Sequence, residues 1–139
     1  MAPPRFFTVD EANSLLPSLE PLMRRLAETR ARLQKHHVVM EEFRARAGGN
    51  GGAFLGGRFA EAQQEIERRT AELQEGIQEI ESWGCVVKDL ERGLVDFPAR
   101  RGDEQVFLCW RLGESRIAYW HGLEEGFAGR KPIEEESMG

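Results

Sequence analysis

Two segments with heptad-spaced apolar residues, separated by a glycine-rich stretch, constrain the fold of this chain more than any other feature. In the second segment, Phe59 and Leu73 belong to a series that recurs every seven residues. This spacing lines up apolar side chains along one stripe of a helix. We therefore expect two long helices, over residues 9–47 and 58–82, that pack as an antiparallel, coiled-coil-like hairpin. The apolar residues of the two stripes are Leu15, Leu19, Leu22, Leu26, Leu33, Met40 and Phe43, then Phe59, Ile66, Leu73, Ile77 and Ile80.

Local signals predict where these helices begin and end. The motif TVDE, which starts at Thr8, is a capping box and should begin the first helix at Val9. Pro17 and Pro21 each remove a backbone donor, so we expect a kink or a short break early in this helix. Six of the ten residues in GGNGGAFLGG, residues 48–57, are glycine, which predicts a loop between the helices.

The two predicted helices carry opposite charge. Residues 24–46 contain seven basic and three acidic side chains, whereas residues 58–82 contain three basic and seven acidic ones. Antiparallel packing would bring these complementary surfaces together. A single hairpin leaves much of its heptad surface uncovered. We expect a second copy of the chain to cover it in a homodimer, and packing against the C-terminal sheet is the alternative.

The composition excludes several classes of protein. The net charge of −5 argues against a nucleic-acid-binding protein, which needs a clustered basic face. The sequence has no apolar run of roughly 20 residues that could span a membrane, and it begins without a signal-peptide pattern. Cys85 and Cys109 lack a Cys-x-x-Cys spacing, so we expect a cytoplasmic, reduced protein with two buried thiols, and a disulfide or a metal role is the alternative.

After Gly84 the pattern changes from helical to strand periodicity. The short runs CVVKD, LVDFP, EQVFLCWR and RIAYW are separated by the turn sequences LERG and LGES. We expect a small antiparallel meander of three or four strands within residues 85–133, followed by an acidic tail at residues 134–139. The predicted fold class is therefore α+β, in a single domain.

A two-residue hairpin loop at Gly113-Glu114 would set the register of the last two strands. Arg111 would then lie opposite Arg116, where like charges destabilise. We therefore expect an anionic group between them: Asp96, Glu114 or a bound anion. The other pairs of this register are Trp110 with Ile117, Leu108 with Tyr119, Val106 with His121, Phe107 with Trp120 and Cys109 with Ala118.

We expect any functional site in the segment YWHGLEEGFAGRKPI, because its glycines permit sharp turns and its apolar residues can anchor it. His121 is the candidate acid, base or metal ligand, because histidine is the side chain best suited to these roles near neutral pH, with Asp96 or Glu114 as its carboxylate partner. Arg130 is the candidate anion ligand. The other tentative anion ligands are Arg111, Arg116 and Lys88. Phe127 should be buried.

A purely structural interpretation of the same residues stays open. His121 would only end a strand, and Arg130 would only pair with Glu124 or Glu125. No motif for a catalytic triad, a zinc site or a cofactor is present, so no cofactor is assigned. A metal would need His121 together with Asp96 or Glu114.

The segments FFTVDEANSLLPSLEPL, VVKDLERGLVDFP and VFLCWRLGESRIAYWHGLEEGFAGRKPI resemble an uncharacterised prokaryotic family known as a domain of unknown function, DUF2203. The resemblance implies two long helices and a small C-terminal β region, and it supplies no catalytic residues. It places any site where the start of the first helix, with Glu11 and Asn13, meets the sheet and the Phe127 loop.

Three functional hypotheses follow. The first is a non-catalytic protein that binds a partner, a small ligand or an anion through the sheet and the Phe127 loop. The second is an enzyme built around His121 and a carboxylate, with or without a divalent metal. The third is a purely structural coiled-coil adaptor.

Overall fold

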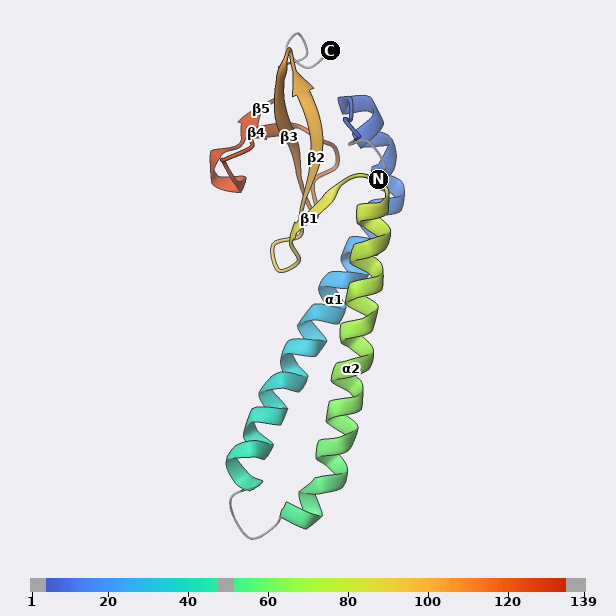
Figure 1. Cartoon of the computed structure of the whole chain (residues 1–139), viewed down its shortest axis with the longest axis vertical. Helices are drawn as coiled ribbons and strands as arrows, with labels where there is room; N and C mark the ends of the chain where they lie inside the picture. The colour runs from blue at the N-terminus through green and yellow to red at the C-terminus, as the bar shows by residue number, and fades with distance from the viewer. Residues whose placement is uncertain (1–4, 48–51, 135–139) are drawn as a thin grey trace.

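The protein is a long helical hairpin with a small antiparallel sheet at one end (Figure 1). The computed structural model describes residues 5–47 and 52–134. The elements are α1 (Val9–Ala47), α2 (Gly52–Ser82), β1 (Val86–Asp89), β2 (Leu94–Arg101), β3 (Glu104–Arg111), β4 (Tyr119–Gly122), the 3₁₀ turn η1 (Phe127–Gly129) and β5 (Lys131–Pro132). This arrangement confirms the predicted α+β class, with five strands where three or four were expected.

The capping box begins α1 as predicted. The Thr8 amide donates to the Glu11 carboxylate at 3.0 Å, and the Glu11 amide donates to the Thr8 hydroxyl at 3.1 Å. Of the predicted kink or short break at Pro17 and Pro21, the break is absent, because α1 runs through both prolines as one helix, but the start of α1 is inclined to the rest of the helix (Figure 1). Each proline removes only its own N–H from the helical ladder, and the turns around them are held by packing against the rest of the domain.

The second helix begins earlier than the sequence predicted. α2 starts at Gly52, within the stretch expected to be a loop. Glycine lowers helix stability by about 1 kcal/mol per residue but does not prevent a helical backbone, so the glycines predict the position of a boundary only loosely. Residues 48–51 of the expected loop lie outside the described part of the chain.

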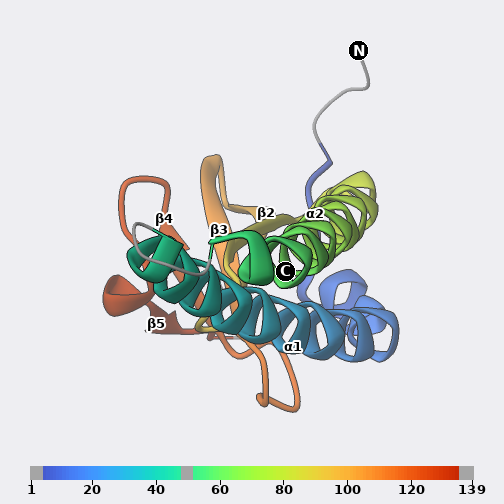
Figure 2. The same cartoon turned by 90° about the horizontal axis from the view of Figure 1, so that it is seen from below.

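The half of the hairpin near the sheet contributes to the core, whereas the distal half packs only helix against helix (Figures 1 and 2). Leu19, Met23 and Leu26 are at most 2% exposed. Further along, Leu33 and Phe43 are only half-buried. The same heptad pattern is therefore better covered near the sheet, although Met40 in the distal half is also buried.

The five strands form a meander in the order β1-β2-β3-β4-β5. Alternate residues of the three central strands face the helices and form the core together with the buried residues of α1 and α2. These inward-facing residues are Val95, Phe97, Ala99, Val106, Leu108, Trp110 and Trp120. The intervening residues of the same strands must point to the opposite, outer face.

The predicted register of β3 and β4 is wrong by one residue. Phe107 lies opposite His121, and Cys109 lies opposite Tyr119. The tight turn runs from Arg111 to Glu114, whose amide donates to the Arg111 carbonyl at 2.9 Å, and Gly113 within it has a φ of +105°. Because side chains alternate between faces, this shift moves the β4 histidine from the core face to the outer face.

The predicted opposition of two arginines is also wrong. Arg111 ends β3 and Arg116 lies in the connection to β4, and both side chains are exposed. Asp96 lies elsewhere, buried on the outer face and hydrogen-bonded to a histidine. No anion is needed between the arginines, because the longer connection removes the cross-strand contact that the shorter loop would have imposed.

Two hydrogen bonds join the described N-terminal part of the chain to the sheet region. The Asn13 side-chain oxygen accepts a hydrogen bond from the Ile117 amide at 2.7 Å, across a sequence separation of 104 residues. The Phe7 amide donates to the Pro98 carbonyl at 2.7 Å. Asn13 therefore fixes the β3–β4 connection against α1.

Replacing Asn13 with alanine should destabilise the fold by about 1–3 kcal/mol, because it leaves the Ile117 amide without its acceptor in a buried setting. Ser14→Ala is the matched control, since Ser14 is exposed and its hydroxyl only donates within α1. Urea denaturation would measure both. Equal losses for the two variants would contradict the role assigned to Asn13.

Candidate functional site

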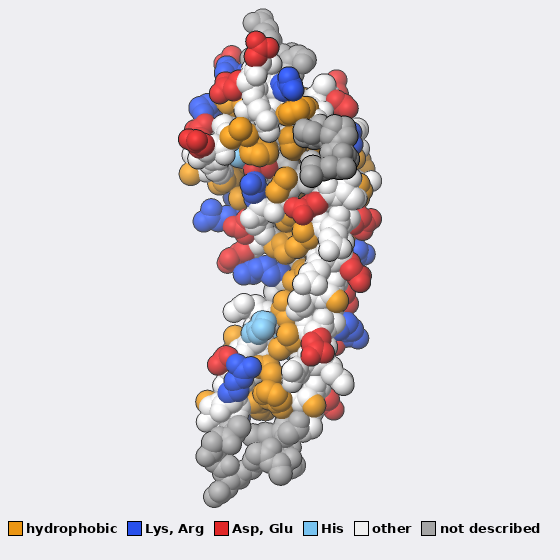
Figure 3. All heavy atoms as spheres, viewed as in Figure 1, with side chains coloured by type: hydrophobic (Ala, Val, Ile, Leu, Met, Phe, Trp, Pro, Cys, Tyr) orange, Lys and Arg blue, Asp and Glu red, His pale blue; other side chains and the backbone are white. Residues whose placement is uncertain are grey.

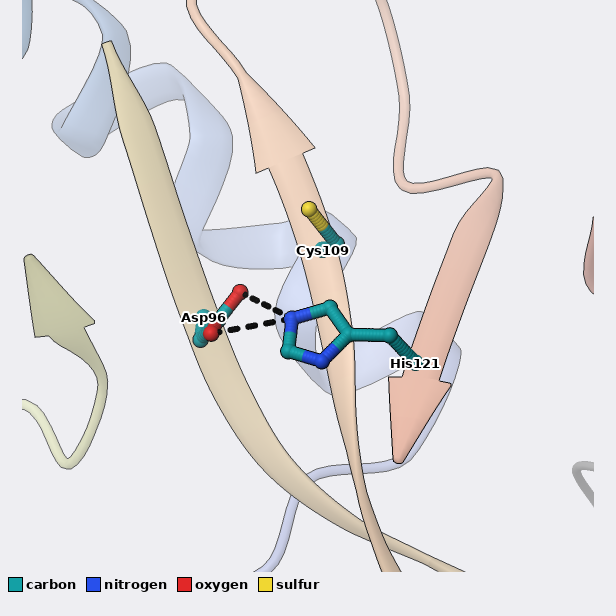
Figure 4. A group of neighbouring side chains, drawn as sticks. All are labelled: Asp96, Cys109 and His121. Carbon is teal, nitrogen blue, oxygen red and sulfur yellow. Dashed lines mark hydrogen bonds and ion pairs between the residues drawn. The ribbon is translucent and has the colours of Figure 1, made fainter. Parts of the chain in front are cut away.

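The outer face of the sheet carries three buried polar or thiol side chains on adjacent strands (Figure 4). Asp96 on β2 and His121 on β4 are each 3% exposed, and Cys109 on β3 is 1% exposed. The register places Asp96 directly opposite Cys109. Tyr119 of β4 lies opposite Cys109, and His121 is two residues further along the same strand. All three side chains therefore share one face of the sheet.

Both ring nitrogens of His121 face hydrogen-bond acceptors. Nε2 lies 3.0 Å from each carboxylate oxygen of Asp96, and Nδ1 lies 2.9 Å from the Gly122 carbonyl oxygen. The carbonyl can only accept, so Nδ1 carries a proton and donates it. A second proton must then lie between Nε2 and the carboxyl group. Burial raises the pKa of Asp96, against the opposing effect of the histidine hydrogen bond.

The thiol of Cys109 completes the group. Its sulfur and the ligand atoms of Asp96 and His121 all lie within 4.8 Å of one another. Burial and the nearby Asp96 carboxylate together raise the pKa of the Cys109 thiol to about 11, against the opposing effect of the Arg130 guanidinium. The thiol is therefore protonated at neutral pH and is a poor nucleophile as it stands.

A small pocket lies over this group. Its volume is about 150 Å³. Lys88 lies over the Phe107 ring at 5.3 Å, and this ring in turn contacts the ring of His121 at 5.6 Å between centroids. The lining residues are Lys88, Leu94, Asp96, Phe107, Cys109, His121, Leu123, Glu125, Gly126 and Phe127. The pocket thus combines apolar walls with a polar floor.

The segment after β4 covers the pocket and is held at several points. Arg130 donates twice to Glu114, at 2.9 and 3.1 Å, and lies over the rings of Tyr119 and Phe127 at 4.0 and 4.2 Å. The Glu125 carboxylate accepts a hydrogen bond from the Gly122 amide at 3.0 Å and another from the Lys131 ammonium group at 2.8 Å. The cover is therefore an ordered part of the fold.

The structure brings some of the predicted residues together and separates others. His121 and Asp96 share the buried group, and Lys88 lies at its pocket. Arg130 is held by a carboxylate, that of Glu114, and not by Glu124 or Glu125, which the purely structural interpretation named. The other two candidate arginines, Arg111 and Arg116, are exposed.

Two further expectations are corrected. Phe127 is half-buried, not buried, because one of its faces is covered by the Arg130 guanidinium and not by core side chains. Glu11 and Asn13 serve the capping box and the β3–β4 connection, so the start of α1 does not contribute to the polar group. The helix packs on the core face, whereas the group lies on the other face of the sheet.

Cys109 is the member that sequence reasoning missed. The sequence predicts a buried thiol there, with a disulfide or a metal role as the alternative, and it has no recognised metal-ligand spacing that would link Cys109 to His121 and Asp96. The available signal was alternation: Asp96 and Cys109 fall on the same face once β2 and β3 are paired correctly.

Removing the charge of the Glu114 carboxylate should destabilise the fold measurably. Its side chain and that of Arg130 are 23% and 17% exposed, and Glu114 also accepts from the Arg111 amide at 2.7 Å. We expect Glu114→Gln to cost about 1–3 kcal/mol. Glu125→Gln is the control, since its lysine pair is more exposed and should contribute less. Chemical denaturation that found the larger loss for Glu125→Gln would contradict this assignment.

Comparison with known proteins identifies a family without a described activity. Residues 5–133 match the model of a family described as an uncharacterized conserved protein, DUF2203. Searches of curated proteins and of solved structures found no significant match.

Proposed function

Because the chain belongs to this DUF2203 family, whose description names no activity, we propose its function from its geometry: it is a small-ligand-binding protein. The proposed site is the pocket over Asp96, Cys109 and His121. The observation that carries the proposal is that three polar or thiol side chains, each at most 3% exposed, converge beneath an ordered cover. Buried polar groups of this kind destabilise a fold unless they are fully paired, and they often mark binding sites.

The geometry favours binding over acid–base or nucleophilic catalysis. Neither ring nitrogen of His121 is free to accept the proton of Cys109, since one donates to a carbonyl and the other engages Asp96. The Arg130 guanidinium beside the Cys109 thiol lowers its pKa, but burial and the Asp96 carboxylate outweigh this effect, so the thiol stays protonated and is not activated as a nucleophile. An enzyme built on this histidine would first have to release it from Asp96.

The geometry also bears on the anion-binding hypothesis. Arg130 already donates two hydrogen bonds to Glu114, so its planar fork is occupied by a carboxylate of the same chain. Lys88 is the cation that lines the pocket. A small anion in the pocket would therefore be bound by Lys88 and not by Arg130.

The histidine ring itself reports on occupancy. The chain has three histidines, and His36 and His37 lie on α1, in the hairpin. We expect at least one of acetate, inorganic phosphate or a divalent metal chloride to shift the His121 ring signals in NMR spectra. The same compound should raise the melting temperature, because it binds only the folded state.

The two hairpin histidines are the internal control and should keep their signals. If no compound shifts His121, or if all three histidines shift together, the pocket is not a specific ligand site.

We also propose that the hairpin forms a homodimer in the cytoplasm. In the distal half, Leu33, Phe43, Phe59 and Ile66 are only half-buried, and Val38 and Val39 are 51% and 38% exposed. Figure 3 shows apolar side chains along the strip between the two helices in this half. A four-helix arrangement with a second copy would cover them.

The charges of the hairpin support the same assembly. Among the described residues, the ion pairs of the hairpin lie within one helix or join Arg30 of α1 to Glu91 of the β1–β2 turn. The basic surface of α1 and the acidic surface of α2 therefore remain available. In a two-fold dimer, each α1 can face the α2 of the partner, so both contacts join opposite charges.

Among the described residues, neither α1 nor α2 contains an apolar stretch of the length that spanning a bilayer requires.

Sedimentation at micromolar concentration should give about twice the 15.8 kDa of one chain. Val38→Asp should weaken the dimer by at least about tenfold, because it places a charge in the apolar contact. Leu123→Asp is the matched control, since Leu123 is also 51% exposed but lies beside the sheet. A wild-type monomer, or equal weakening by both variants, would contradict a dimer through the hairpin.

A further inference from the structure

We infer that the ligand of this pocket is a divalent cation of the zinc type, held by Asp96, Cys109 and His121. The inference rests on the proposed binding function and names the chemical class of its ligand. Within the described residues, these three side chains form the group of histidine, cysteine and acidic residues that can converge on one ion.

The distances suit such an ion. Ligand atoms at 2.0–2.3 Å from a tetrahedral zinc ion lie roughly 3.3–3.7 Å from one another. The ligand atoms of the three side chains lie within 4.8 Å of one another, with 3.0 Å between Nε2 and the carboxylate. Small rotations of the side chains would therefore bring all three atoms into coordinating range. The ion would take the place of the proton that now lies between His121 and Asp96.

The outer hydrogen bond of His121 supports the inference independently. A metal-bound histidine donates its other ring N–H to a carbonyl or carboxylate, which fixes the orientation of the ring. Here Nδ1 lies 2.9 Å from the Gly122 carbonyl, which leaves Nε2 to face Asp96 and Cys109. The Gly122 carbonyl also accepts from the Glu125 amide at 3.1 Å, and the Gly122 amide donates to the Glu125 carboxylate at 3.0 Å, so the end of β4 is anchored to the cover.

Charge and proton balance are also consistent. On binding, the thiol of Cys109 loses its proton and the His121–Asp96 pair loses the proton on Nε2, so two protons are released for each ion. One thiolate and one carboxylate then neutralise a divalent cation. Without the ion, the same buried group must keep those protons to avoid two neighbouring negative charges.

The ligand types select the class of metal. A thiolate and an imidazole favour Zn²⁺ or Co²⁺, whereas Mg²⁺ and Ca²⁺ prefer oxygen ligands alone. Three protein ligands leave a fourth position, and all three line the pocket, so that position opens into it. Water or a small ligand would occupy it between Phe107, Leu123 and Phe127.

Cobalt titration of metal-stripped protein tests the inference. One equivalent of Co²⁺ should produce the near-ultraviolet thiolate charge-transfer band and the visible bands of a tetrahedral site. Cys109→Ser should abolish the thiolate band, and Asp96→Asn should weaken Zn²⁺ binding by at least about tenfold. Cys85→Ser is the matched control, because Cys85 is the other buried free thiol and should leave the band intact.

A second measurement avoids the risk that Cys109→Ser fails to fold. The ¹¹³Cd chemical shift of the wild-type complex should report one sulfur ligand, and Zn²⁺ but not Mg²⁺ should raise the melting temperature. Absence of a thiolate band, its persistence in Cys109→Ser, its loss in Cys85→Ser, or a cadmium shift typical of a site without sulfur would each overturn the inference. If His121 still responded to acetate or phosphate in those cases, the pocket would bind ligands but not this metal.

Discussion

Burial of one apolar face of the sheet against α1 and α2 is the constraint on which the rest of the structure depends. Trp110, Phe97 and Leu108 on that face are all completely buried. Burying a large apolar side chain contributes about 1.5–3 kcal/mol, so the cluster fixes which residues of each strand point inward. The residues between them must then point outward. Asp96, Cys109 and His121 meet because the core beneath them leaves their strands no other register.

The same constraint divides the molecule into two parts with different roles. The end of the hairpin near the sheet supplies one side of the core, and Asn13 connects it to the β3–β4 turn. The distal end extends beyond the sheet and keeps exposed apolar and charged surface (Figures 1 and 3). Assembly through the distal half and ligand binding at the outer face can therefore occur without competing for the same surface.

The buried group of Asp96, Cys109 and His121 on the outer face contributes little to the stability of this small domain. A buried, paired acid and histidine usually stabilise a fold no better than apolar side chains of the same shape. The Arg130–Glu114 pair and the anchored Glu125 hold the cover over this group without using its polar atoms. A bound ion would use those atoms, which gives the group a physical role beyond packing.

The sequence alone determined the features that depend on neighbouring residues: the capping box at Thr8, the heptad stripe of α1, and the change to strand periodicity after Gly84. Each of these features arises from contacts between residues that are close in the chain, so the local sequence pattern is enough to predict it. The α+β class and the location of His121 near the edge of a small sheet were predictable in the same way.

Only the tertiary structure decided the site. A difference of one residue in the turn at Gly113 moves His121 to the other face, and the Ile117 amide bonds to Asn13 from 104 residues away. Local preferences of the turn cannot specify this register, because packing of Trp110 and Leu108 on the helices selects it. The meeting of Cys109 with Asp96 and His121 followed from that selection, so no spacing in the sequence could reveal it.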